Sequence, residues 1–152
     1  MMVIVRGFFV LAFFMLSMMS GYSQVDPIAK ARKVFQDYVD LSAQFDEKVV
    51  NLYSDRAEIQ NTRVYPNGEK RVMKMEAQKY KALLKKVLPL AKLRKDTNGY
   101  EDVAYVKEGN RVVIKATRIS HLKGYASPMV ITIGEDQDGE WRILREYSQS
   151  KP

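Results

Sequence analysis

The sequence contains no cysteine and a single histidine, His121. The lack of cysteine excludes a disulfide scaffold, an iron–sulfur cluster, a thiolate zinc site and a cysteine nucleophile. One histidine is too few for the usual multi-histidine metal sites. Motifs typical of phosphate-binding loops, serine hydrolases, zinc peptidases and calcium loops are also missing. We therefore expect no metal site and no cofactor.

What the chain does contain is typical of one globular domain. It has 152 residues, of which 46% are hydrophobic and 28% are charged. This length supports one ordinary hydrophobic core and is too short for two.

Residues 1–23 have the pattern of an export signal. Arg6 is their only charged residue, an unbroken apolar run follows from Phe8 to Leu16, and the small residues Gly21 and Ser23 precede a plausible cleavage point. The apolar run is shorter than the roughly 20 residues of a membrane span. We predict a signal peptide over residues 1–23 and a mature chain over residues 24–152. The protein would then be periplasmic or secreted, and an uncleaved anchor is the alternative.

Periodicity and turn signals predict three helices and six strands in the mature chain. The first helix starts at Asp26-Pro27, and its apolar stripe consists of Ala31, Val34, Tyr38, Leu41 and Phe45. A short second helix follows Asp46, and a third covers residues 76–93. The predicted strands are 57–65, 70–74, 100–107, 111–122, 128–134 and 140–147. This order indicates a single α+β domain, with three helices of the N-terminal half packed on a curved antiparallel sheet.

Two of the predicted strands, 111–122 and 128–134, are apolar on both faces. A sheet covered by helices on one face normally alternates more strictly between apolar and polar residues. The pattern favours a homodimer formed through the sheet. The alternative is that these strands are simply rich in good strand formers.

Two segments resemble nuclear-transport-factor-2-like proteins. These are the run from Val50 to Ile59, where a Leu-Tyr, an acidic residue and an alanine lead into the first strand, and the ending Asp138-Gly139-Glu140-Trp141-Arg142-Ile143. The order of elements agrees with that family over residues 26–148. The resemblance implies a cone-shaped, cystatin-like fold with a pocket between the sheet and the helices. The family includes ketosteroid isomerases, dehydratases, polyketide cyclases, binding modules and domains of secretion machines, so the fold does not fix the function.

The resemblance also bears on catalysis. Isomerase-type members carry a carboxylate base on the first strand, at a position that Asn61 occupies in this chain. An amide cannot act as a general base, which argues against isomerase chemistry of that type.

Several side chains are candidates for a site. His121 is a candidate acid or base, because only histidine has an unperturbed pKa near neutrality, and Asp55 is its candidate partner. The alternatives are a solvated histidine at the sheet rim and an aspartate that forms a local turn. The candidate ligand-binding residues are Tyr38, Tyr53, Asn61, His121 and Tyr147. Tyrosines that converge on a cavity would orient the polar group of a ligand, whereas ordinary core packing is the alternative.

Positive charge is concentrated between Lys70 and Lys95, where ten basic residues and one acidic residue give a net charge of +9. On the third helix the predicted lysine face consists of Lys79, Lys81, Lys85, Lys86 and Lys92. Such a face is either simply solvated or binds an anionic partner such as phospholipid head groups, a wall polymer or an acidic protein. Nucleic acid is disfavoured because aromatic residues are missing among these lysines. Insertion of the helix in a membrane is also disfavoured, because the core needs its apolar side, which includes Leu83 and Val87.

Three functions are compatible with these observations. The first is an exported module that binds a small apolar or amphipathic ligand in a pocket without an acid–base pair. The second is a cofactorless isomerase or dehydratase that uses His121 beside a carboxylate. The third is an interaction protein of the cell envelope that uses the lysine face.

Overall fold

A computed structural model of the protein describes residues 26–152. The predicted signal peptide lies outside these residues. The helices are α1 (Pro27–Ala43), the 3-10 helix η1 (Glu47–Leu52) and α2 (Ala77–Arg94). The strands are β1 (Tyr53–Val64), β2 (Lys70–Glu76), β3 (Asn98–Glu108), β4 (Arg111–Ser120), β5 (Tyr125–Glu135) and β6 (Trp141–Ser150). Every predicted element is present, and the largest shift is the start of β1 at Tyr53.

The first two helices begin where the capping residues predict. The carboxylate of Asp26 accepts a hydrogen bond from the backbone N–H of Ile28 at 3.1 Å, and Pro27 occupies the first turn. The carboxylate of Asp46 accepts from the N–H of Lys48 at 2.8 Å. These bonds satisfy N–H groups that have no partner within the helix.

The six strands form one sheet in the order β2-β1-β6-β5-β4-β3. Four of the five pairings are antiparallel, as predicted, but β1 pairs with β6 in parallel, so the sheet is mixed. Turn signals fix pairings only between consecutive strands, whereas β1 and β6 come from opposite ends of the domain. The sequence therefore carries no local signal for their relative direction.

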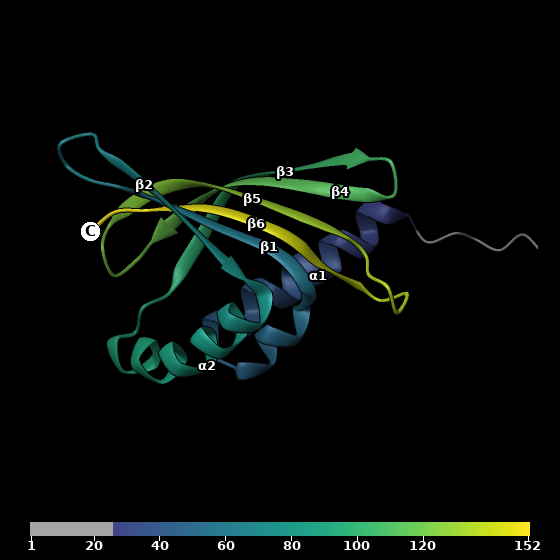
Figure 1. Ribbon diagram of the computed structural model, residues 1–152, viewed down its shortest axis with the longest axis horizontal. Coiled ribbons are helices and arrows are strands. Elements are labelled where there is room, and N and C mark those ends of the chain that lie inside the picture. The colour runs from purple at the N-terminus through teal and green to yellow at the C-terminus, as the bar shows by residue number, and fades with distance from the viewer. Residues whose placement is uncertain (1–25) are drawn as a thin grey trace, which may run out of the picture.

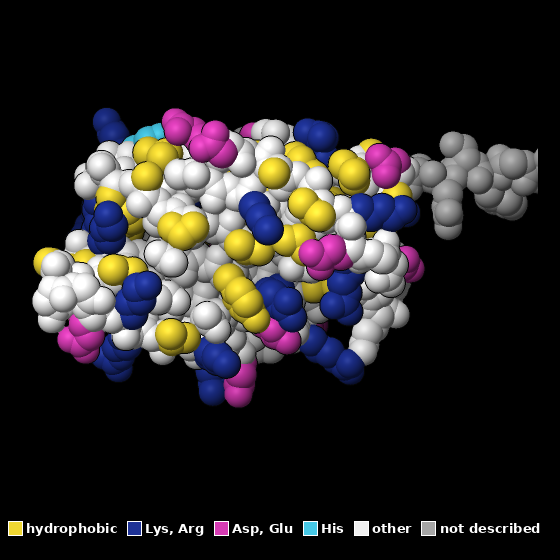
Figure 2. All heavy atoms as spheres, turned by 90° about the horizontal axis from the view of Figure 1, so that it is seen from above, with side chains coloured by type: hydrophobic (Ala, Val, Ile, Leu, Met, Phe, Trp, Pro, Cys, Tyr) yellow, Lys and Arg dark blue, Asp and Glu magenta, His cyan; other side chains and the backbone are white. Residues whose placement is uncertain are grey.

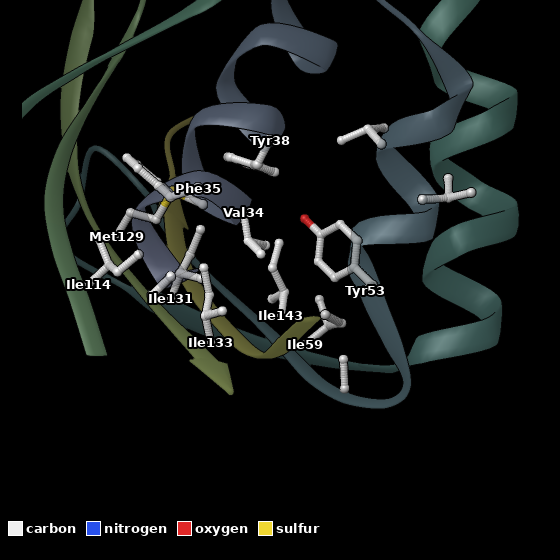
Figure 3. Packing of buried hydrophobic residues seen from close by; sticks show 14 of the residues in the cluster. Val34, Phe35, Tyr38, Tyr53, Ile59, Ile114, Met129, Ile131, Ile133 and Ile143 are labelled. Atoms are coloured by element: carbon white, nitrogen blue, oxygen red, sulfur yellow. The ribbon is translucent and has the colours of Figure 1, made fainter. Parts of the chain in front are cut away.

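The helices cover the inner face of the curved sheet and leave its outer face open (Figure 1). Inward side chains of β4, β5 and β6 meet α1 in the core, which includes Phe35, Ile114, Ile131 and Ile143 (Figure 3). Among residues 26–152, no helix has the length and hydropathy needed to cross a bilayer.

The outer face of the sheet mixes apolar and charged side chains (Figure 2). By register, Val113 of β4 and Val130 of β5 point outward, and both are half-buried. Val106 of β3 is 43% exposed. Pairing of two copies through this face stays a prediction.

The third helix buries less of its apolar surface than its pattern predicts. Leu88 is buried and Leu84 is partly buried against the core, but Leu83 and Val87 are each 40% exposed. The expectation that both belong to the core is wrong, because the sheet and η1 contact only one narrow side of α2.

Candidate functional site

A cavity of about 210 Å³ lies between the helices and the inner face of the sheet. Its apolar lining includes Leu84 and Leu88 of α2 and Phe45 after α1. Its polar lining includes Tyr38, Tyr53, Tyr80, Tyr100, Arg118 and Glu146. Among the hollows of the described surface, this one contains a buried carboxylate, so we take it as the candidate site.

The buried carboxylate belongs to Glu146 of β6, which is 3% exposed. The hydroxyl of Tyr53 donates to its Oε2, and the hydroxyl of Tyr80 donates to its Oε1 at 3.3 Å. Each carboxylate oxygen thus has one phenol donor, as a buried polar group requires. Tyr53 comes from the start of β1 and Tyr80 from α2, so this carboxylate links the sheet to the helix.

Opposing effects set the pKa of Glu146. Burial raises this pKa above its ordinary value of 4.5, whereas the Tyr53 hydrogen bond, the positive charge of Arg118 and the Tyr80 hydrogen bond lower it, and burial dominates. Burial also raises the pKa values of the Tyr38, Tyr53 and Tyr80 hydroxyls well above 10.0. These three phenols are therefore neutral donors at physiological pH.

A second hydroxyl pair lies farther along the cavity. The Tyr100 hydroxyl of β3 donates to the Tyr38 hydroxyl of α1 at 3.3 Å. The rings of Tyr38, Tyr53 and Tyr80 also pack edge to face. The ring centroids of Tyr38 and Tyr53 are 6.4 Å apart, and those of Tyr53 and Tyr80 are 5.4 Å apart. Figure 3 shows Tyr38 and Tyr53 facing one another from α1 and β1. Such contacts give the cavity a rigid aromatic wall.

Arg118 brings a positive charge to the same cavity. Its Nη2 donates to the carbonyl of Gln149 at 2.5 Å, but its Nε is buried without a hydrogen-bond partner. A buried N–H without a partner is costly unless a water or a ligand meets it. The cavity is thus lined by one cation, two acidic side chains, Glu146 and Asp96, and several neutral hydroxyls.

Of the predicted ligand-binding residues, Tyr38 and Tyr53 line the cavity, and Tyr147 and Asn61 do not. The Tyr147 hydroxyl donates to Glu58 at 3.1 Å on the outer face. Asn61 Nδ2 donates to Ser148 Oγ at 3.0 Å, and Asn61 Oδ1 accepts from Ser150 Oγ at 2.8 Å. Both ends of its amide are thus bonded to β6, outside the cavity lining.

The structure does not bring the predicted catalytic pair together. His121 is exposed in the turn after β4, where its Nδ1 lies 2.9 Å from the Thr97 hydroxyl. Its ring covers Gly99, where an added Cβ would lie 2.9 Å from Nε2. Asp55 is exposed on β1 and accepts from Lys81 Nζ at 2.6 Å, which lowers its pKa. Neither side chain lines the cavity, because β4 ends at Ser120 and Asp55 points away from the core.

Sequence reasoning missed Glu146 because of an irregularity in β6. Strict alternation from Ile143 points Tyr147 inward and Glu146 outward. The register instead shifts between Thr132 and Ile133 of β5, so that Leu144 is an extra residue and Glu146 shares the inner face with Ile143. The available signal was that Glu146 is the one acidic residue of β6.

The lysines of the predicted lysine face differ in their exposure and in their partners. Lys81 lies toward the sheet with its side chain only 16% exposed, held by Asp55. Lys79 forms an exposed ion pair with Glu76 at 3.2 Å. Lys85, Lys86 and Lys92 are exposed. No group of three potential metal ligands converges among residues 26–152.

No family model matches the sequence, and a search of curated proteins finds no match. Solved structures do match. An NTF2-like protein with a cystatin-like fold from Novosphingobium aromaticivorans superposes with a TM-score of 0.57 at 13% identity, over 81% of this chain and 80% of that one. An NTF2-like protein of unknown function from Pseudomonas putida gives 0.61 at 9% identity, over 80% and 84%. A candidate ketosteroid isomerase from Shewanella frigidimarina gives 0.54 at 12% identity, over 78% and 94%.

At these identities the likeness concerns the fold. The similar proteins share the curved sheet wrapped around helices, and their described roles range from unknown to candidate isomerase. The chain therefore has the NTF2-like, cystatin-like fold that the resemblance of its sequence implies.

Proposed function

We propose that the protein binds a small, neutral, amphipathic molecule in the cavity between α1, α2 and the sheet. The observation that carries this proposal is the buried Glu146 carboxylate, with a phenol donor on each oxygen, at the wall of a cavity that also has apolar lining. The polar group of the ligand would meet Arg118 and the tyrosine hydroxyls. Its apolar part would contact Leu84 and Leu88.

Charge and size both restrict this ligand. Glu146 and Arg118 have opposite charges in the cavity, and Asp96, the third charged side chain of its lining, is only half-buried, so a charged ligand would find no buried charge left to compensate it. The volume of about 210 Å³ is below the range of about 300–1,000 Å³ typical of pockets for drug-sized molecules. A compact molecule with a single polar end fits best.

Mass spectrometry of protein purified under native conditions from its own host tests the proposal. We expect a bound small molecule in the native spectrum that is absent after denaturation. Leu84→Trp fills the cavity and should release this molecule, whereas Leu93→Trp on the exposed side of the same helix should keep it. An empty wild-type protein, or equal retention by Leu84→Trp, would contradict the proposal.

Export is part of the proposal, and it is supported by the signal-like pattern of residues 1–23. The mass of the mature protein tests it, since cleavage after Ser23 leaves a chain that starts at Gln24. A protein that keeps Met1 after membrane fractionation would support the anchor instead.

A second candidate is acid–base catalysis in the same cavity, with Glu146 rather than His121 as the titrating group. The supporting observation is that burial raises the Glu146 pKa, as a proton-transferring carboxyl requires. The similar Shewanella frigidimarina protein is itself a candidate ketosteroid isomerase. If the retained molecule is converted, Glu146→Gln should abolish conversion even at ligand concentrations that saturate the cavity, whereas unchanged conversion would remove this candidate.

A further inference from the structure

Helix α2 exposes a second apolar face besides the one that packs in the core. Leu83 and Val87 are each 40% exposed, Leu90 is 47% exposed and Leu93 is 83% exposed. The buried side of the same helix is formed by Ala77, Tyr80, Leu84 and Leu88. The apolar residues of α2 thus serve two separate surfaces.

Basic residues share this exposed face. At about 100° per residue, four apolar and three basic side chains fall within an arc of about 120°. We call this surface the α2 arc, and it consists of Lys79, Leu83, Lys86, Val87, Leu90, Leu93 and Arg94. Helix α2 contains no acidic residue at all.

The charges of the α2 arc are mostly uncompensated. Within residues 26–152, no ion pair involves Lys86 or Arg94. Lys79 pairs with Glu76 at 3.2 Å, but both side chains are more than 70% exposed, so this pair contributes little. The segment from Lys70 to Lys95 has a net charge of +9. An anionic partner is therefore favoured.

From this combination we infer that the α2 arc docks on a lipid bilayer that contains anionic lipids. Leucines among lysines and arginines are typical of helices that lie in a membrane interface, with the leucines in the acyl boundary and the cations at the head groups. Nucleic acid would favour aromatic side chains, which the α2 arc lacks. The sequence argued against membrane contact because the core was expected to need the whole apolar side of this helix. The exposed side chains of the α2 arc are not needed for the core, so that objection does not apply to them.

The position of α2 permits such docking. The helix lies on the opposite side of the molecule from the outer face of the sheet (Figure 1). A flat bilayer can thus reach the α2 arc while the outer face stays free. Val87 belongs to the arc and also lines the cavity, so the cavity opens beside the proposed contact.

Co-sedimentation with lipid vesicles tests this inference. We expect the wild type to bind vesicles of phosphatidylcholine with phosphatidylglycerol, to bind phosphatidylcholine vesicles weakly, and to lose binding as salt rises. Leu90→Ser and Lys86→Gln should each reduce the binding constant about tenfold, because one removes an inserted side chain and the other a head-group contact. Circular dichroism would verify that each variant is folded.

Two variants elsewhere on the surface are matched controls. Leu122 is 47% exposed, like Leu90, and Lys115 is an exposed lysine on the outer face. Leu122→Ser and Lys115→Gln should bind vesicles like the wild type. Three results would overturn the inference: no vesicle binding by the wild type, an equal loss in the controls, or binding to polyglutamate in place of vesicles.

Discussion

The Glu146 side chain is a carboxylate that the fold keeps away from water by supplying two phenol donors and a nearby guanidinium. Such a group is stable only while its partners remain, because a buried oxygen without a donor loses its hydration and gains nothing in return. The tyrosines around it are therefore expected to matter more for stability than tyrosines at the surface.

Removal of one phenol donor tests this expectation. Tyr53→Phe keeps the buried ring but leaves Glu146 Oε2 without its donor, so we expect the free energy of unfolding to fall by about 1–3 kcal/mol. Tyr147→Phe, which removes a hydroxyl bonded to the exposed Glu58, should change it by less than about 0.5 kcal/mol. Denaturant unfolding measures both variants, and equal effects would argue against a special role for Glu146.

The raised pKa of Glu146 also predicts a pH dependence. As pH rises through the ordinary value of 4.5, the unfolded chain ionises this carboxyl before the folded protein does, so its contribution to stability falls with rising pH until the folded pKa is passed. The difference in unfolding free energy between wild type and Glu146→Gln isolates this effect, since other carboxyls are common to both proteins. We expect the wild-type value minus the Glu146→Gln value to fall as pH rises from 4.5 to the folded pKa. A rise over this pH range would contradict a raised pKa for Glu146.

For single residues, the sequence predicted the candidate site only in part. Tyr38 lies at the cavity as expected, because helical spacing fixes its direction. Tyr53 also lies there, although it begins β1 instead of belonging, as predicted, to the short second helix. Glu146 escaped prediction because the extra residue Leu144 reverses the alternation of β6, and a bulge has no reliable sequence signature. His121 was predicted as an acid or base from its residue type alone, because the sequence did not show that its side chain lies outside the cavity.

At the scale of the elements, existence was more predictable than boundaries or faces. Caps at Asp26 and Asp46 and glycine-containing turns marked where elements begin and end. The faces of α2 could not be derived, since an apolar stripe does not reveal how wide a surface its neighbours cover. The parallel β1–β6 pairing depends on contacts between the two ends of the domain, which local patterns do not encode.

The two faces of α2 predict contrasting mutational effects. Leu88 is 8% exposed, so Leu88→Ala should reduce the unfolding free energy by about 2–5 kcal/mol through lost burial and a new cavity. Leu93 is 83% exposed, so Leu93→Ala should change it by less than about 0.5 kcal/mol. Thermal and denaturant unfolding of both variants provide the comparison. Similar losses would mean that the helix packs differently.

For the molecule as a whole, no helix covers the outer face of the sheet, and we predict that two copies pair through this face. By register, Val106, Val113 and Val130 lie on this face. Figure 2 shows that apolar and charged side chains are mixed on it. We expect sedimentation velocity to show a dimer whose fraction rises with concentration, and Val113→Asp to shift it to monomer by placing a charge in the contact. Lys92→Asp on α2 is the control and should leave the dimer intact. A wild type that stays monomeric at high concentration would show that these valines only favour the strand conformation.

A protein-observed NMR screen with small neutral fragments that carry a phenol, alcohol or amide group tests whether the cavity at Glu146 binds a ligand. We expect some fragments to shift the signals of Tyr53, Tyr80 and Tyr100, with an affinity that Glu146→Gln reduces and His121→Ala leaves unchanged. A screen in which no fragment enters the cavity, or in which His121→Ala reduces affinity as much as Glu146→Gln does, would contradict ligand binding at Glu146.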